Sequence, residues 1–156
     1  MLQINIPGRE KLEFQYLVLD FNGTLALDGY LKQGVPPRLK ELSEYLRIYV
    51  LTADTHGSVH HEMDSMPCEV HVIRPDKQDE EKAGFIKKLG ADKTICIGNG
   101  LNDRLMLKES KLGLLVIQEE GIATPSFMVS DVICTSINDA LDLLLKPDRL
   151  RATLRN

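Results

Sequence analysis

The chain has 156 residues, of which 43% are hydrophobic and 27% charged, enough for a soluble globular domain that buries a core without metals or disulfides. A net charge of −4 argues against nonspecific nucleic-acid binding, and we expect no signal peptide and no membrane-spanning apolar run. Three widely spaced cysteines without metal-binding spacing indicate free thiols in a cytoplasmic protein. These features predict a single domain over residues 1–156.

The first residues alternate between apolar and polar side chains. Residues 2–6 and then Leu12 and Phe14 show this pattern, with the turn signal Pro7-Gly8 between them. This predicts a hairpin arm over residues 1–15, with an expected role as an antiparallel edge of the sheet or as a subunit contact. Residues 16–20 follow as an apolar strand that is buried on both faces and ends in a carboxylate.

Strands and helices alternate through the rest of the chain. We expect further strands at 48–52, 70–73, 94–98, 112–117 and 130–134. Expected helices begin at Pro36 and Thr124 or cover 58–65, 78–89, 103–109 and 136–145. Residues 27–35 suit a loop or small flap, and the 147–156 tail suits a surface extension or a subunit clasp. The alternation predicts an α/β fold with a parallel sheet and right-handed crossovers.

Polar residues follow the first buried strand. Asp20 ends it, at the position where open α/β sheets bind ligands. Gly23 permits a sharp turn, and Thr24 offers a hydroxyl and an amide to an anion. An Asx-turn that simply ends the strand explains the same residues equally well.

Three later positions carry similar ambiguity. Thr52 ends the second strand, and it suits either an anion contact or a helix N-cap. Lys82 lies near the first turn of a helix, where the macrodipole disfavours a cation, and most lysines are solvated. The loop 99–103, Asn-Gly-Leu-Asn-Asp, leads from a strand into a helix and suits metal and phosphate chemistry.

In this order, the stretch 20–24 (Asp-Phe-Asn-Gly-Thr), the stretch 52–54 (Thr-Ala-Asp), Lys82 and the loop 98–103 resemble the four motifs of the haloacid dehalogenase-like superfamily, especially its P-type ATPase branch. The resemblance covers nearly the whole chain from Tyr16 onward. It implies a three-layer Rossmann-like fold with strand order 3-2-1-4-5. Only 27 residues separate Thr24 from Thr52 and 29 separate Thr52 from Lys82, so we expect no cap domain.

The resemblance also implies a role for each motif residue. Asp20 is the implied nucleophile, and the implied catalytic set is Asp20, Asn22, Thr52 and Lys82. The implied Mg²⁺ ligands are Asp20, the Asn22 backbone carbonyl, Asn99 and Asp103. The implied phosphate contacts are Gly23, Thr24, Thr52, Ala53, Lys82 and Asn102. The expected function is a Mg²⁺-dependent phosphohydrolase or phosphotransferase that acts on a small phosphorylated substrate through an aspartyl phosphate.

Two residues depart from the family pattern. Asn22 stands where phosphatases of the superfamily carry the Asp that protonates the leaving group, and an amide does not titrate. Asn99 replaces a charged Mg²⁺ ligand with a neutral one, which weakens binding of a hard cation. Turnover is therefore expected to be slow. Two alternatives stay open: a catalytically weak phosphate- or metal-binding regulatory module, and a scaffold for subunit assembly.

The remaining polar clusters have simpler interpretations. His56, His60 and His61 suit a solvated helix better than a transition-metal site, because adjacent helical side chains diverge by about 100°. The acidic run 79–81 suits the N-terminus of a helix. Because an uncapped site is open to water, we expect a homo-oligomer, most simply a tetramer, in which the arm, flap or tail of a neighbour covers it.

Overall fold

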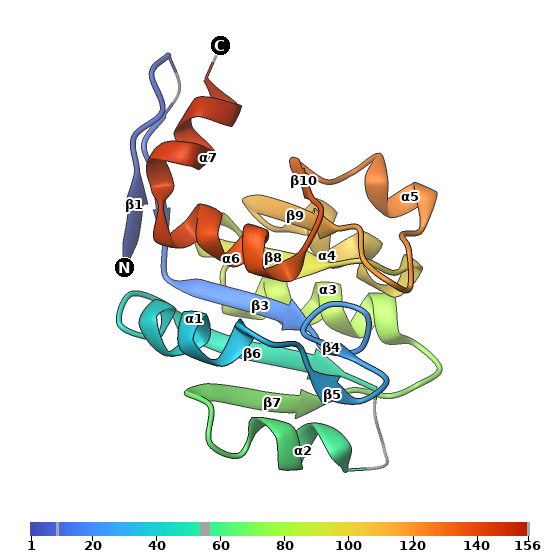
Figure 1. The fold of residues 1–156 in the computed structure, drawn as a ribbon. Coiled ribbons are helices and arrows are strands. Elements are labelled where there is room, and N and C mark those ends of the chain that lie inside the picture. The colour runs from blue at the N-terminus through green and yellow to red at the C-terminus, as the bar shows by residue number, and fades with distance from the viewer. Residues whose placement is uncertain (9, 54–56, 156) are drawn as a thin grey trace.

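The computed structural model describes residues 1–8, 10–53 and 57–155. A parallel sheet of six strands forms the centre, in the order β7-β6-β3-β8-β9-β10 (Figure 1). Its strands are β3 (Tyr16–Asp20), β6 (Arg47–Thr52), β7 (Cys68–Val72), β8 (Thr94–Gly98), β9 (Leu112–Val116) and β10 (Val132–Cys134). The expected order 3-2-1-4-5 is confirmed, and β10 extends it beyond β9. The strand that ends in Asp20 is therefore central, paired with β6 and β8.

Helices cover both faces of this sheet (Figure 1). One face carries α1 (Val35–Leu42), α2 (Ser58–Met63) and α6 (Ile137–Leu145), and the other carries α3 (Gln78–Leu89) and α4 (Arg104–Glu109). Short helices follow at Ala91–Lys93, Leu101–Asp103 and α5 (Thr124–Phe127). Along β3, Leu17 and Leu19 enter the core beneath α1 and α6, while Val18 enters the core beneath α3 and α4. A strand covered on both faces must be largely apolar, and β3 is so until Asp20 ends it.

The segment after β3 forms the expected small flap. It consists of β4 (Ala26–Leu27) and β5 (Tyr30–Leu31), which pair antiparallel. The Leu31 N–H donates to Glu62 Oε2 at 2.9 Å, and Lys32 forms an ion pair with Glu119. The flap, α1 and β6 occupy the interval between Thr24 and Thr52, so that interval has no room for a cap domain.

The N-terminal hairpin forms, but its expected place at an edge of the main sheet is wrong. Strands β1 (Leu2–Ile4) and β2 (Leu12–Phe14) pair only with each other. The chain passes from β2 into the central strand through Gln15, whose backbone bonds to Lys93 and Arg47 at the amino ends of both neighbouring strands. Both sides of β3 are thus occupied, and the hairpin instead packs buried apolar side chains, such as those of Ile4 and Phe14, into the core.

The C-terminal tail, expected as a surface extension or a subunit clasp, forms a further helix, α7 (Pro147–Leu154). Leu150 is fully buried in the same core as the hairpin, and Leu154 lines a groove with Ile6 and Leu12. Figure 1 shows α7 beside the hairpin at the amino end of the sheet. Of the three segments considered for a subunit contact, the arm and the tail therefore lie away from Asp20. The tetramer itself stays a prediction.

None of the helices in the described ranges is both long enough and apolar enough to span a bilayer. The helices instead bury one face each against the sheet or against one another.

Replacing Leu150 with alanine tests whether α7 belongs to the fold. Because Leu150 is fully buried, Leu150→Ala is expected to lower the free energy of unfolding by about 2–5 kcal/mol. Urea denaturation followed by circular dichroism measures this change. The exposed Thr153→Ala in the same helix serves as the control, with an effect within about 0.5 kcal/mol. Equal, small effects of both variants would mean that α7 is a loosely attached tail.

Candidate active site

A cavity of about 660 Å³ opens at the carboxyl end of the sheet, above β3, β6 and β8. Its walls come from five separate segments of the chain. They comprise Asp20, Asn22, Thr52, Ala53, Gln78, Asn99, Gly100, Leu101, Asn102 and Glu120. Six of the ten predicted site residues line this cavity directly, and the other four lie beside or beneath them.

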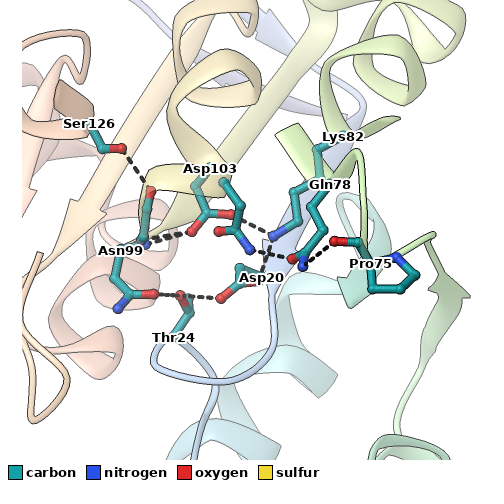
Figure 2. A network of polar contacts seen from close by, with 10 residues as sticks. Asp20, Thr24, Pro75, Gln78, Lys82, Asn99, Asp103 and Ser126 are labelled. Carbon is teal, nitrogen blue, oxygen red and sulfur yellow. Dashed lines mark hydrogen bonds and ion pairs between the residues drawn. The ribbon is translucent and has the colours of Figure 1, made fainter. Parts of the chain in front are cut away.

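Lys82 is the centre of the polar network below the cavity (Figure 2). Its Nζ lies 2.6 Å from Asp20 Oδ1 and 2.6 Å from Asp103 Oδ1. Lys82 and Asp103 are both fully buried, and Asp20 is 7% exposed. Although Lys82 lies near the N-terminus of α3, it faces the sheet rather than solvent, so the surface-lysine alternative is wrong.

Further donors fix both carboxylates in place. The Thr24 hydroxyl lies 3.2 Å from Asp20 Oδ2, and the backbone N–H groups of Asn99 and Gly100 donate to Asp103 Oδ2 at 2.9 Å. The Asp103 carboxylate also packs against Gly98, where a Cβ would lie 2.5 Å from Asp103 Cγ. Each carboxylate therefore has one oxygen on Lys82 and the other on a different donor, which holds the pair rigidly.

The network carries more negative than positive charge. Two carboxylates face one ammonium, so one negative charge stays uncompensated in a buried place. Burial, together with the charge of Asp103, raises the pKa of the Asp20 carboxyl from 3.8 to about 6, although Lys82 and Thr24 act to lower it. Burial acts to lower the pKa of Lys82, but the two carboxylates outweigh it and raise that pKa.

The donor set fits a hard divalent cation. Carboxylate and carbonyl oxygens are the ligands that Mg²⁺ prefers, and a buried net negative charge attracts a cation. Among the described residues, no three His, Cys, Asp or Glu side chains are already gathered around one point. The two carboxylates would therefore act with neutral oxygens, as the sequence predicts from Asn22 and Asn99.

The structure gives a reason for the amide at position 99. Asn99 Nδ2 donates to the Gly121 carbonyl at 3.2 Å, and this turns Asn99 Oδ1 toward the Thr24 hydroxyl, 3.3 Å away. An aspartate here would place a carboxylate oxygen against the Gly121 carbonyl oxygen. Gly23 faces the same amide with φ of +81°, and a Cβ there would lie 2.7 Å from Asn99 Nδ2 and collide with Glu120 Oε2.

The loop 118–121, which follows β9, joins the site, a role that no sequence motif indicates. Gln118 Nε2 donates to the carbonyls of Gly23 and Thr24 at 3.0 and 2.9 Å, and its Oε1 accepts the Ile137 N–H at 2.8 Å. Glu120 lines the cavity. The sequence does contain one indication of this role. The loop follows the carboxyl end of a parallel strand, and Asp20 also lies at such an end.

Asn102 also has a partner that the sequence did not reveal. Its Nδ2 donates to Gln78 Oε1 at 2.6 Å, and Gln78 Nε2 donates to the Pro75 carbonyl at 3.1 Å (Figure 2). Ser126 on α5 donates to the Gly100 carbonyl at 2.7 Å. These bonds connect the loop after β8 to the start of α3 and to α5.

None of the histidines in the described ranges takes part in this network. His60 and His61 are exposed on α2, as the solvated-helix interpretation predicts. His56, and Asp54 of the second motif, lie outside the described residues. The acidic run at 79–81 does occupy the first turn of α3.

Comparison with known proteins agrees with this geometry. No protein-family model matches the chain. The uncharacterized protein MJ0073 of Methanocaldococcus jannaschii is 52% identical over 64 residues, which cover 41% of this chain and 69% of MJ0073. The crystal structure of 3-deoxy-D-manno-octulosonate 8-phosphate phosphatase from Moraxella catarrhalis matches with a TM-score of 0.72 at 19% identity, over 90% of this chain and 92% of that one. The chain belongs to one family with MJ0073 and has the capless haloacid dehalogenase-like fold.

A second archaeal relative connects this haloacid dehalogenase-like chain to the P-type ATPases. The soluble P-type ATPase-like phosphatase of Methanocaldococcus jannaschii is 23% identical over 154 residues, which cover 92% of this chain. The chain spans 56% of that relative's length. The Moraxella catarrhalis phosphatase structure contains a magnesium ion, a phosphate ion and a KDO molecule.

The excess charge predicts that Asp20→Asn stabilises the metal-free protein at pH 7.5. The fold raises the pKa of Asp20 from 3.8 to about 6, so wild-type stability falls as the pH rises through that range, whereas an amide does not titrate. The advantage of the variant should therefore shrink as the pH falls below 6. Urea denaturation with EDTA between pH 5 and pH 8 measures it.

The exposed Asp64→Asn is the control, and it should show no such pH-dependent advantage. If Asp20→Asn is instead less stable than wild type at pH 7.5, Lys82 requires both carboxylates and the excess-charge account is wrong.

Proposed function

We propose that the protein is a Mg²⁺-dependent phosphohydrolase or phosphotransferase that forms an aspartyl phosphate on Asp20. The observation that carries the proposal is the buried Lys82, which joins Asp20 to Asp103 beneath an open cavity. A phosphoryl-transfer site needs such a positioned nucleophile with positive charge beside it. The capless fold shared with a phosphatase of a sugar-acid phosphate supports a small phosphorylated substrate.

In this proposal Asp20 attacks phosphorus, and the bond from phosphorus to the leaving oxygen breaks. Lys82 offsets negative charge on Asp20 and on the transferred group. Thr24, with Gly23 beside it, and Thr52, Ala53 and Asn102 would hold the phosphoryl oxygens from the first, second and fourth motifs. Water, or another acceptor in a phosphotransferase, then takes the phosphoryl group and regenerates the Asp20 carboxylate.

Mg²⁺ belongs to the proposal because the donor set fits it. Asp20, the Asn22 carbonyl, Asn99 and Asp103 would hold it, and when bound it would offset the negative charge of the phosphoryl oxygens. Asp103 is already oriented for this by two backbone N–H groups.

Asn22 limits the substrates that such a site turns over quickly. It lines the cavity, but its amide has no proton to give to a leaving oxygen. A leaving group that is stable as an anion, such as a phenolate, needs no such proton. The site is therefore matched to activated phosphate esters or to slow turnover.

A second candidate is a phosphate- or metal-binding regulatory module that keeps the site without useful turnover. Two observations favour it: the neutral Asn22, and the neutral Asn99, which is engaged with Gly121. Such a module would bind Mg²⁺ or phosphate and release no phosphate from esters.

Beryllium fluoride with Mg²⁺ tests the nucleophile, because it mimics a phosphoryl group on a carboxylate. It should raise the melting temperature, with a stabilisation of about 2.7 kcal/mol when the ligand is at 100 times its Kd. Asp20→Asn should lose this shift together with all phosphate release. Differential scanning fluorimetry and a phosphate-release assay measure the two effects.

Asp64→Asn is the matched control and should keep both. Wild-type turnover by Asp20→Asn would rule out the aspartyl-phosphate mechanism. A melting-temperature shift without phosphate release from any substrate would favour the regulatory module.

Because Asn22 cannot protonate a leaving group, aryl phosphates should be cleaved faster than alkyl phosphates. Asn22→Asp should raise turnover of alkyl phosphates by about 10²–10⁴-fold, the usual contribution of general acid catalysis. It should change turnover of aryl phosphates much less. Steady-state kinetics on a phenyl and an alkyl phosphate gives both rates, and an equal effect on the two would contradict this role for position 22.

A further inference from the structure

Three residues of the loop 118–121 contact the first motif, the flap or Asn99, and the fourth, Glu120, lines the cavity. Gln118 holds the carbonyls of the first motif, Glu119 pairs with Lys32 of the flap, and the Gly121 carbonyl holds the Asn99 amide. The bonds of Gln118 and of the Gly121 carbonyl hold the loop in place on both sides of Glu120. Glu120 itself lines the cavity with Asp20, and its Oε2 lies against Gly23, beside the Asn99 amide.

Glu120 differs from its neighbour in how its charge is balanced. Glu119 has the ammonium of Lys32 beside it, whereas no basic side chain within the described ranges forms an ion pair with Glu120. The exposed Glu120 therefore adds an uncompensated negative charge to the mouth of the cavity. Asp20 and Asp103 carry one more negative charge than Lys82 offsets. With Glu120, the site has two net negative charges, which match the charge of a divalent cation.

We propose that Glu120 is the third carboxylate of the Mg²⁺ site and supplies the charge that Asn99 does not. This inference rests on the proposed Mg²⁺-dependent function. Asn99 cannot carry the charge itself, because its amide must donate to the Gly121 carbonyl. One residue from that carbonyl, Glu120 brings a carboxylate to the same corner of the cavity. The exposed side chain is not fixed by packing, so it can turn from Gly23 toward a cation near Asp20.

A magnesium titration of the whole chain tests this assignment without any measurement of activity. Glu120→Gln should raise the Kd for Mg²⁺ by roughly 10–100-fold, the usual effect of losing a carboxylate that supports a metal site. The adjacent Glu119→Gln is the matched control and should keep an affinity near that of wild type. Isothermal titration calorimetry with MgCl₂ gives each Kd, and the melting temperature in EDTA should be unchanged in Glu120→Gln because the residue is exposed.

Placing the carboxylate at position 99 instead of position 120 tests whether the two positions supply the same charge. Asn99→Asp alone should lower the melting temperature in EDTA, because its carboxylate meets the Gly121 carbonyl and Glu120. Asn99→Asp combined with Glu120→Gln should bind Mg²⁺ more tightly than Glu120→Gln alone.

The results distinguish a wrong assignment of Glu120 from a wrong proposal of Mg²⁺-dependent function. If Asp20→Asn loses Mg²⁺ binding while Glu120→Gln binds as wild type, the assignment of Glu120 is overturned and the proposed function stands. Equal weakening by Glu119→Gln and Glu120→Gln also overturns it, since a general surface charge would then explain the effect. If the wild type binds no Mg²⁺, both the inference and the Mg²⁺-dependent function are wrong.

Discussion

Lys82 is fully buried, and two carboxylates that reach it from different elements hold it there. Removing an ammonium from water costs several kcal/mol, so Lys82 stays charged in the interior only because carboxylates are placed beside it. Asp20 comes from the end of β3, Lys82 from α3 and Asp103 from the turn after β8. The adjacency of β3 and β8 in the sheet, and the placement of α3 across their shared face, are therefore conditions for this ion-pair network.

The same conditions explain which parts the sequence predicts. Asp20, Thr52 and Asp103 stand at the ends of regular elements, and their order along the chain resembles a known set of motifs. Periodic burial then places the six strands of the main sheet and the helices that cover it. Glu120 and Gln118 escape detection because they lie in a turn, where no periodicity applies and only the neighbouring strand order brings them to Asp20. The hairpin is misplaced for a related reason: its alternating pattern reveals a strand pair but not the surface against which that pair packs.

Asn99 departs from the motif, and its effect depends on the residues around it. In the sequence, it only replaces a carboxylate with a neutral amide. In the structure its amide ties the loop after β8 to the loop after β9 through Gly121, and that second loop presents its own carboxylate to the cavity. The side chain at position 99 and the conformation of residues 118–121 therefore depend on each other. A change at either position alters the hydrogen bonding of the other.

The hairpin and α7 lie at one end of the sheet, and the cavity lies at the other. The first and last described residues lie at the amino end of the sheet, whereas the cavity opens at the carboxyl end (Figure 1). Any polypeptide joined to either end would therefore emerge on the side remote from Asp20. The architecture is modular in this sense, because tethering, fusion or localisation of the domain can vary without altering access to the cavity.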